Sequence, residues 1–205
     1  MPNSEHIVSS FDRDLEGIQA QIMRMGGLVE EAIAKATEAL DTRDVDLARL
    51  VRSGDTAIDK IDEQVNDEAA RVIAQRQPTA SDLRTVLTVF RISTNLERIG
   101  DYAKNIAKRT ETIIEQPPVD GTGASLRRMA RQVELMLKDA LDAYIQRDAD
   151  LAADVRTRDL DVDQMYSALF REYLTFMMED PRNITACMHL HFIAKNIERM
   201  GDHVT

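Results

Sequence analysis

The chain contains an internal duplication. Residues 95–102 read NLERIGDY, and residues 196–203 read NIERMGDH. Other matches follow in the same order, such as RDVDLA at 43–48 and RDADLA at 147–152. The register between the copies changes only near the prolines, where insertions in loops are well tolerated. Two repeats of this size predict two similar units in tandem and argue against a long solenoid array.

The composition predicts that both units are helical. Aromatic residues make up 4% of the 205 residues, with no Trp and eight Gly, whereas β-strands favour aromatic and β-branched side chains. Apolar residues recur in steps of three and four, as in helices that bury one face. This periodicity predicts six helices, over about 11–40, 44–76, 79–115, 125–146, 148–178 and from 183 onward.

The segment QPPVDGTG at 116–123 has the composition of a loop and lies where the duplication requires a boundary. We therefore expect a first bundle at 1–116, a linker at 117–124 and a second bundle at 125–205. Short connections make consecutive helices antiparallel neighbours. The predicted fold is all-α, with two tandem three-helix bundles related by pseudo-twofold symmetry.

The sequence ends at Thr205, shortly after the second motif. The equivalent helix of the first half is expected to continue well past Tyr102. We therefore expect a truncated C-terminus, with the counterpart of Asn105 just beyond it.

Charge and cysteine content exclude several classes of protein. A net charge of -10 argues against nucleic-acid binding, which needs clustered Lys and Arg. The single cysteine, Cys187, cannot form an intrachain disulfide, and the N-terminus lacks the features of a signal peptide. No apolar run approaches the roughly 20 residues of a membrane span. We expect a cytoplasmic protein without direct membrane insertion.

Each motif places a Glu and an Asp four residues apart, which stacks both carboxylates on one face of a helix. Aspartates on the preceding helix of each half border its apolar stripe, so they are expected to converge with the motif acids. The candidate metal ligands are Glu97, Asp101, Asn105, Asp55 and Asp59 in the first half, and Glu198, Asp202, Asp159 and Asp163 in the second.

The third helix allows two interpretations. Its early apolar stripe, continued by helical steps, arrives at Glu97 and Asp101, whereas the later apolar residues Leu96 and Ile99 lie on nearly the opposite side. Either the helix exchanges its buried face midway, or acids continue the core line, which is costly unless a charge compensates them. The early stripe consists of Leu83, Val86, Leu87 and Phe90.

Clustered carboxylates repel one another, and a bridging cation explains why they would be retained together. An all-oxygen donor set suits hard or borderline-hard ions such as Mg, Mn, Ca or Fe(III). We expect divalent or trivalent metal ions, with Fe, Mg, Mn and Zn as candidates. The alternative is a pair of solvated surface acids, which are common at this spacing. Repetition of the pair in both halves favours the metal site.

Other chemistry-bearing residues are weaker candidates. His189, His191 and His203 correspond to Thr88, Phe90 and Tyr102 in the first half, so we expect structural or solvent-facing roles for them. The Glu-x-x-His pair of di-iron oxidases is absent, as are a phosphate-binding Gly-rich loop and a nucleophile motif.

The two motifs, together with RQPTASDLR at 76–84 and MMED at 177–180, resemble the duplicated E(D)xxxD signature and loops of the PhoU family. The resemblance covers essentially the whole chain. It implies two three-helix bundles, multinuclear metal clusters held on the bundle surfaces by the motif acids, and a regulatory role in phosphate homeostasis. It also implies two partners, the ATPase of the phosphate ABC transporter and the phosphate-sensing histidine kinase.

Three functions remain in competition. A metal-binding regulatory adaptor that represses the phosphate regulon needs exposed helical surface and no catalytic groups. A carboxylate-bridged metal enzyme needs an acid or base beside an open coordination site, and a metal-storage bundle is its non-catalytic variant. A purely structural bundle needs neither. We favour the non-enzymatic adaptor, and we expect it to be a homo-oligomer, a dimer.

Overall fold

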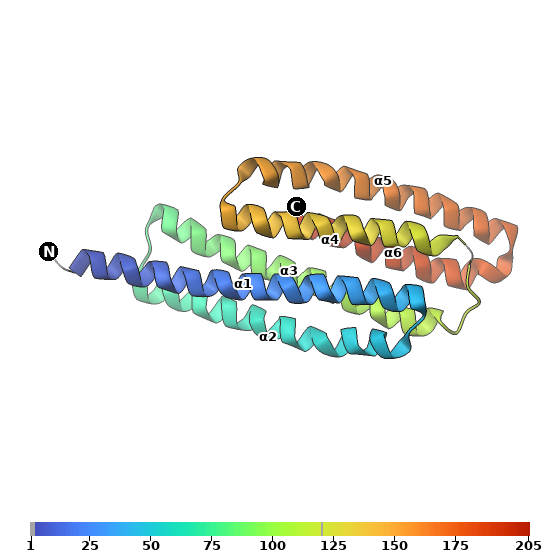
Figure 1. The fold of residues 1–205 in the computed structure, drawn as a ribbon, viewed down its shortest axis with the longest axis horizontal. Coiled ribbons are helices and arrows are strands. Elements are labelled where there is room, and N and C mark those ends of the chain that lie inside the picture. Colours follow the sequence, from blue (N-terminus) through green and yellow to red (C-terminus); the bar gives the residue numbers. More distant parts are fainter. Residues whose placement is uncertain (1–2, 120) are drawn as a thin grey trace.

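The computed structural model describes residues 3–119 and 121–205, with side chains from residue 11 onward. The described part is helical and contains no strand, which confirms the all-α prediction (Figure 1). Its elements are α1 (Asn3–Thr42), α2 (Val45–Arg76), α3 (Ala80–Ile113), α4 (Thr122–Gln146), α5 (Ala149–Glu179), the short 3-10 helix η1 (Pro181–Asn183) and α6 (Ile184–Val204).

The helices form two antiparallel three-helix bundles, α1–α3 and α4–α6, that lie side by side along their length (Figure 1). The bundles meet where α3 packs on α6 and α1 packs on α4. α3 and α6 run in opposite directions, because Asn95 contacts His203 while Arg109 contacts Phe192. This arrangement confirms the predicted pseudo-twofold relation between the halves.

The hydrophobic core is continuous across both bundles. The buried apolar residues join into one cluster to which every α-helix contributes. The halves are therefore packed onto each other and share one interior. Buried members from α1 to α6 include Val29, Ile61, Ile99, Val133, Val162 and Met200.

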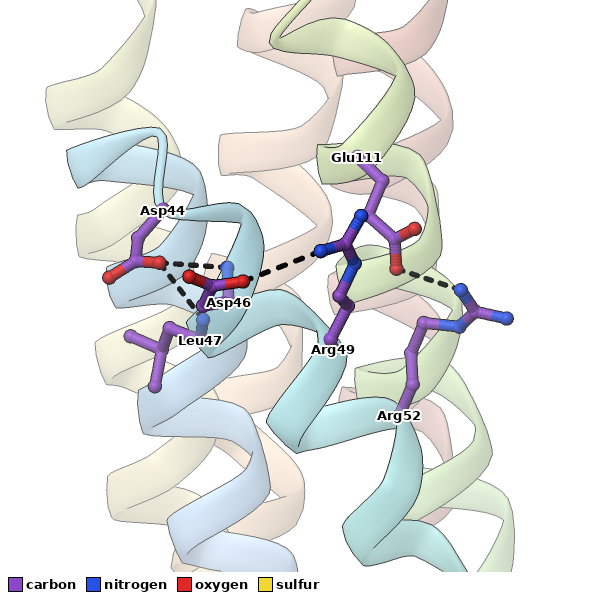
Figure 2. A network of polar contacts seen from close by, with 6 residues as sticks. All are labelled: Asp44, Asp46, Leu47, Arg49, Arg52 and Glu111. Carbon is purple, nitrogen blue, oxygen red and sulfur yellow. Dashed lines mark hydrogen bonds and ion pairs between the residues drawn. The ribbon is translucent and has the colours of Figure 1, made fainter.

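The turns between the first two helices of each half repeat in detail. Arg43 and Arg147 both adopt left-handed backbone conformations, with φ of 57° and 54°. Asp44 then caps α2 by accepting from the backbone N–H groups of Asp46 and Leu47, both at 2.9 Å (Figure 2). Such caps satisfy N–H groups that the first helical turn leaves unpaired. Asp148 caps α5 in the same way.

Ion pairs reinforce the same end of the first bundle. Arg49 lies 3.4 Å from Asp46 within α2, and Arg52 reaches across to Glu111 of α3 at 2.8 Å (Figure 2). Arg43 donates from Nη2 to the carbonyl oxygens of Ile114 and Gln116 at 2.5 and 2.8 Å. These hydrogen bonds hold the α1–α2 turn against the connection between the two halves.

The connection runs between the end of α3 at Ile113 and the start of α4 at Thr122. It overlaps the linker expected at 117–124, and α4 begins three residues before the expected 125. Asp120 lies outside the described residues. The proposed domain limits, 1–116 and 125–205, stay a prediction.

The buried face of α3 differs from both sequence interpretations. Val86, Val89, Ser93 and Leu96 form one buried stripe, and the helix does not exchange faces. Placing Leu87 in the core was wrong, because its side chain is 48% exposed. The polar residue Ser93 lies on the core line, so apolar periodicity alone did not reveal it.

Adjacent glycines in α1 provide a test of the contact between the halves. A Cβ atom at Gly26 would collide with Leu141 of α4, whereas one at Gly27 would meet open space. We expect Gly27→Ala to raise the free energy of unfolding by about 1 kcal/mol through helix propensity. Gly26→Ala should lose this gain to overpacking, which costs about 1–3 kcal/mol. Urea unfolding followed by circular dichroism measures both, and equal stability of the two variants would contradict a rigid contact between Gly26 and the Leu141 side chain.

Candidate functional site

The acids of the first half gather where α2 and α3 approach closely. Asp55 of α2 is buried, with 4% of its surface exposed. Gly100 of α3 faces it, and a Cβ atom there would lie 3.0 Å from Ile58 Cδ1 and 3.8 Å from Asp55 Oδ1. The motif glycine therefore leaves room for Ile58 of α2, next to the buried aspartate.

Lys104 is the internal counter-ion of this cluster. Its Nζ donates a hydrogen bond to Asp55 Oδ2 and lies 3.6 Å from Asp101 Oδ1. The hydrogen bond to Asp55 is the main cause that raises the pKa of Lys104, against the opposing effect of burial. This lysine was not among the residues predicted from the sequence, although its position three residues after Asp101 was the available signal.

The remaining acids of the first half lie close enough to repel one another. Burial raises the pKa of Asp59, and repulsion from Asp55, Asp101 and Asp62 adds to the effect. The pKa of Glu97 is likewise raised by burial and then by Asp101. The structure thus brings together the predicted acids of α2 and α3.

Neighbouring groups hold some of these carboxylates in place. Ser93 Oγ donates to Asp62 Oδ1 at 2.5 Å, and Asn66 Nδ2 donates to Asp62 Oδ2 at 3.0 Å. Arg98 is largely exposed and bridges the motif acids, with Nε 3.6 Å from Glu97 Oε2 and Nη1 3.7 Å from Asp101 Oδ2. Several hydrogen-bond donors and one arginine therefore compensate the negative charge of the cluster.

The second half reproduces the close approach. A Cβ atom at Gly201 of α6 would lie 2.7 Å from Asp159 Oδ1 of α5. Burial is the largest cause that raises the pKa of Asp159, followed by repulsion from Asp163, Asp202 and Glu198. All four acids predicted for the second half are therefore neighbours.

The counter-ion of the second half occupies a different position. Lys195 Nζ lies 2.5 Å from both carboxyl oxygens of the buried Glu198 and donates a hydrogen bond to Oε1. In the aligned repeats, Lys195 corresponds to Thr94 and Lys104 to Thr205. Each half thus compensates its acids with a lysine that the other half lacks.

The acids are clustered but do not form a preformed metal cage. Within the described side chains, no three or more His, Cys, Asp or Glu residues are arranged so that they could hold an ion. Asn105, the remaining candidate ligand, lines a separate cleft between α3 and α6. The donor chemistry still fits a hard cation, since the candidate ligands offer oxygen atoms and the carboxylates repel one another. The ligand assignment stays a prediction.

Two of the three histidines weighed as candidates, His191 and His203, take part in packing between helices. His203 Nδ1 lies 3.1 Å from Asn95 Oδ1, and its ring centroid is 5.6 Å from that of Tyr102. His191 packs against the rings of Tyr166 and Phe170. These contacts agree with the structural roles expected for them.

The Lys104–Asp55 pair can be tested by its contribution to stability. We expect Lys104→Met to lower the free energy of unfolding by about 1–3 kcal/mol, because Asp55 would stay buried without its charged donor. The loss should shrink in an Asp55→Asn background, as a double-mutant cycle measures. Lys108→Met, one turn further along α3, is the matched control and should be nearly neutral. Equal losses at both lysines would contradict the role assigned to Lys104.

Comparison with known proteins identifies the family. Residues 22–110 and 126–205 match the PhoU domain, once in each half. A phosphate-specific transport system accessory protein PhoU homolog of Caulobacter vibrioides (strain NA1000 / CB15N) is 46% identical over 202 residues, covering 98% of this chain and 88% of the relative. The homolog of Rhizobium meliloti (strain 1021) is 45% identical over 200 residues, with coverage of 98% and 84%.

Solved structures give the same result. The crystal structure of PhoU from Pseudomonas aeruginosa superposes with a TM-score of 0.92 at 38% identity, covering 95% of this chain and 93% of that one. The phosphate transport system regulatory protein PhoU from Streptococcus pneumoniae gives 0.87 at 30% identity, with coverage of 95% and 91%. The motifs, the paired three-helix bundles and these similarities together establish that the chain belongs to the PhoU family.

Proposed function

We propose that this protein is a metal-binding regulatory adaptor of phosphate transport that represses the phosphate regulon when phosphate is plentiful. Its relatives are named accessory proteins of phosphate-specific transport, and the Streptococcus pneumoniae neighbour is named a regulatory protein of that system. These names support a role that is regulatory and not enzymatic.

The observation that carries the metal-binding part is the repeated approach of a motif glycine to a helix aspartate. Gly100 lies against Asp55 and Gly201 lies against Asp159, each beside the Glu–Asp pair of its own half. A helix–helix contact this close, made next to clustered acids in both halves, supports binding of a cation between the two helices.

The residues that would hold metal come from both helices of each half. In the first half they are Glu97 and Asp101 with Asp55 or Asp59, and Lys104 would have to turn away from Asp55. In the second half they are Glu198 and Asp202 with Asp159 or Asp163, and Glu198 would exchange Lys195 for the ion. A bound ion would supply positive charge that cross-links the two helices.

The proposed partners are the ATPase of the phosphate ABC transporter and the phosphate-sensing histidine kinase, and the proposed location is the cytoplasm. Among the described residues, each helix is too short or too polar to cross a bilayer, so contact with a membrane transporter would be made through its ATPase. A reciprocal free-energy coupling between the two partners would let transporter state set kinase state. We propose a homodimer as the working assembly.

Metal binding is tested by removing carboxylate charge from one half at a time. Glu97→Gln with Asp101→Asn should lower the bound metal by about half, as should Glu198→Gln with Asp202→Asn, because each pair removes ligands of one of two sites. Elemental analysis after loading with manganese or iron gives the stoichiometry. The control is Glu63→Gln with Asp67→Asn, an exposed pair of the same spacing on α2. Unchanged stoichiometry in both motif variants would refute the ligand assignment.

Regulation is tested with a phosphate-regulon promoter reporter in excess phosphate. Deletion of the gene should switch the reporter on, and the wild-type copy should silence it again. Arg199→Glu should restore silence only in part, because Arg199 is an exposed cation beside the acids of the second motif. Arg84→Glu, an equal charge change at an exposed position at the far end of α3, is the control. A silent reporter in the deletion strain would overturn the regulatory proposal.

A further inference from the structure

A polar cleft of about 330 Å³ lies between α3 and α6, apart from the acidic clusters. One wall is formed by residues on a single face of α3, and the other by two residues on a single face of α6. A volume of this size is at the lower end for small-molecule sites, which span about 300–1,000 Å³. Its lining residues are Asn105, Lys108, Arg109 and Thr112 from α3, and His189 and Asn196 from α6.

The lining carries positive charge and hydrogen-bond donors, and none of its residues is a carboxylate. Lys108 and Arg109 form no ion pair with any carboxylate in the described part of the chain, although acids outnumber bases, with 36 Asp and Glu against 26 Lys and Arg. Of the other basic residues of α3, Arg98 and Lys104 are engaged with acids, whereas Arg84 and Arg91 form no ion pair among the described residues and lie outside the cleft lining. Two adjacent cations left without acidic partners therefore mark this cleft as a place for an external anion.

The position of Arg109 suits anion recognition. Its guanidinium lies over the ring of Phe192, 4.2 Å from the ring centroid. A stacked guanidinium is held in place by its face while its N–H edge stays available for hydrogen bonding. Phe192 is itself 42% exposed, so the stack lies at the surface where a ligand can reach it.

An unpartnered polar atom lies in the same wall. His189 Nδ1 is buried and makes no hydrogen bond within the described residues. Buried nitrogen atoms of this kind are usually paired, so a missing partner calls for an explanation. His189 therefore brings a nitrogen without a protein partner to the residues that line the cleft.

The α6 wall of the cleft is not repeated in the first half. The positions equivalent to His189 and Phe192 there are Thr88 and Arg91. The equivalent of Asn196 is Asn95, whose side-chain oxygen already pairs with His203.

We propose that the α3–α6 cleft binds a phosphoryl oxyanion, either as inorganic phosphate or as the phosphate group of a small phosphorylated metabolite. Arg109 offers two parallel N–H donors to such a group, Lys108 a point charge, and Asn105, Asn196 and Thr112 neutral donors. The proposal goes beyond the regulatory function above. It does not require metal on the carboxylate clusters.

The test measures binding of inorganic phosphate and of ATP to the full chain by equilibrium dialysis. The protein is treated with chelator first, so that metal held by the carboxylates cannot bind the phosphate. We expect saturable binding of at least one of the two probes. Tighter binding of ATP, displaced by phosphate only at high concentration, would identify the metabolite form, and the reverse order would identify inorganic phosphate.

The variants locate the site. Lys108→Gln with Arg109→Gln should weaken binding at least tenfold, and the single exposed change Lys108→Gln should weaken it less while leaving the fold intact. The matched control, Lys60→Gln with Arg84→Gln, removes the same two charges from exposed positions on α2 and α3 and should bind as the wild type does. Phosphate or ATP should also shift the nuclear magnetic resonance signals of the His189 ring.

Two results would overturn the proposal. One is the absence of saturable binding of either probe at millimolar concentration. The other is an equal loss of affinity in the cleft variants and in the control, which would show that overall charge and not the cleft attracts the anion. In either case the regulatory and metal-binding proposals would stand, because their tests do not use this cleft.

Discussion

The antiparallel packing of α3 on α6 is the contact on which the rest of the structure depends. These helices carry the two motifs, and their association joins two bundles that each continue into the same hydrophobic core. Because the buried stripes of both helices face this shared interior, the motif acids are left on the flanks. There they meet the aspartates of α2 and α5. The same contact creates the basic cleft, since the α3–α6 surface is polar where it opens to solvent.

Charge compensation is the second constraint. Each half gathers carboxylates beside a glycine that allows close helix contact, and each uses one lysine to offset them. The two lysines occupy non-equivalent positions, so the halves are equivalent in their acids but not in their counter-ions. An ion that binds either cluster would compete with a different lysine in each half. If both clusters bind metal as proposed, the two sites should therefore differ in affinity even though their acids match.

The sequence determined the elements and the repeat because both are local properties. Helical periodicity and the register change near the prolines place the six helices near their final limits, although α1 begins at Asn3 and not near residue 11. The duplication also determined which acids belong together, since Asp159 and Asp163 could be matched to Asp55 and Asp59 by register. The error at Leu87 has a local origin too, because Ser93 is a polar residue within a buried stripe and periodicity counts only apolar ones.

The tertiary structure decided which residue of another helix each side chain contacts. No local sequence pattern contains this information. It showed that Lys104 of α3 donates a hydrogen bond to Asp55 of α2 and that Ser93 of α3 donates one to Asp62 of α2. It also showed that the two halves share one core and that Lys108 and Arg109 lie beside His189 across the α3–α6 boundary. These pairings depend on the distance and angle between helices that are far apart in the chain. The sequence determined the helices and their acids by itself, whereas only packing decided the counter-ions, the shared interior and the cleft.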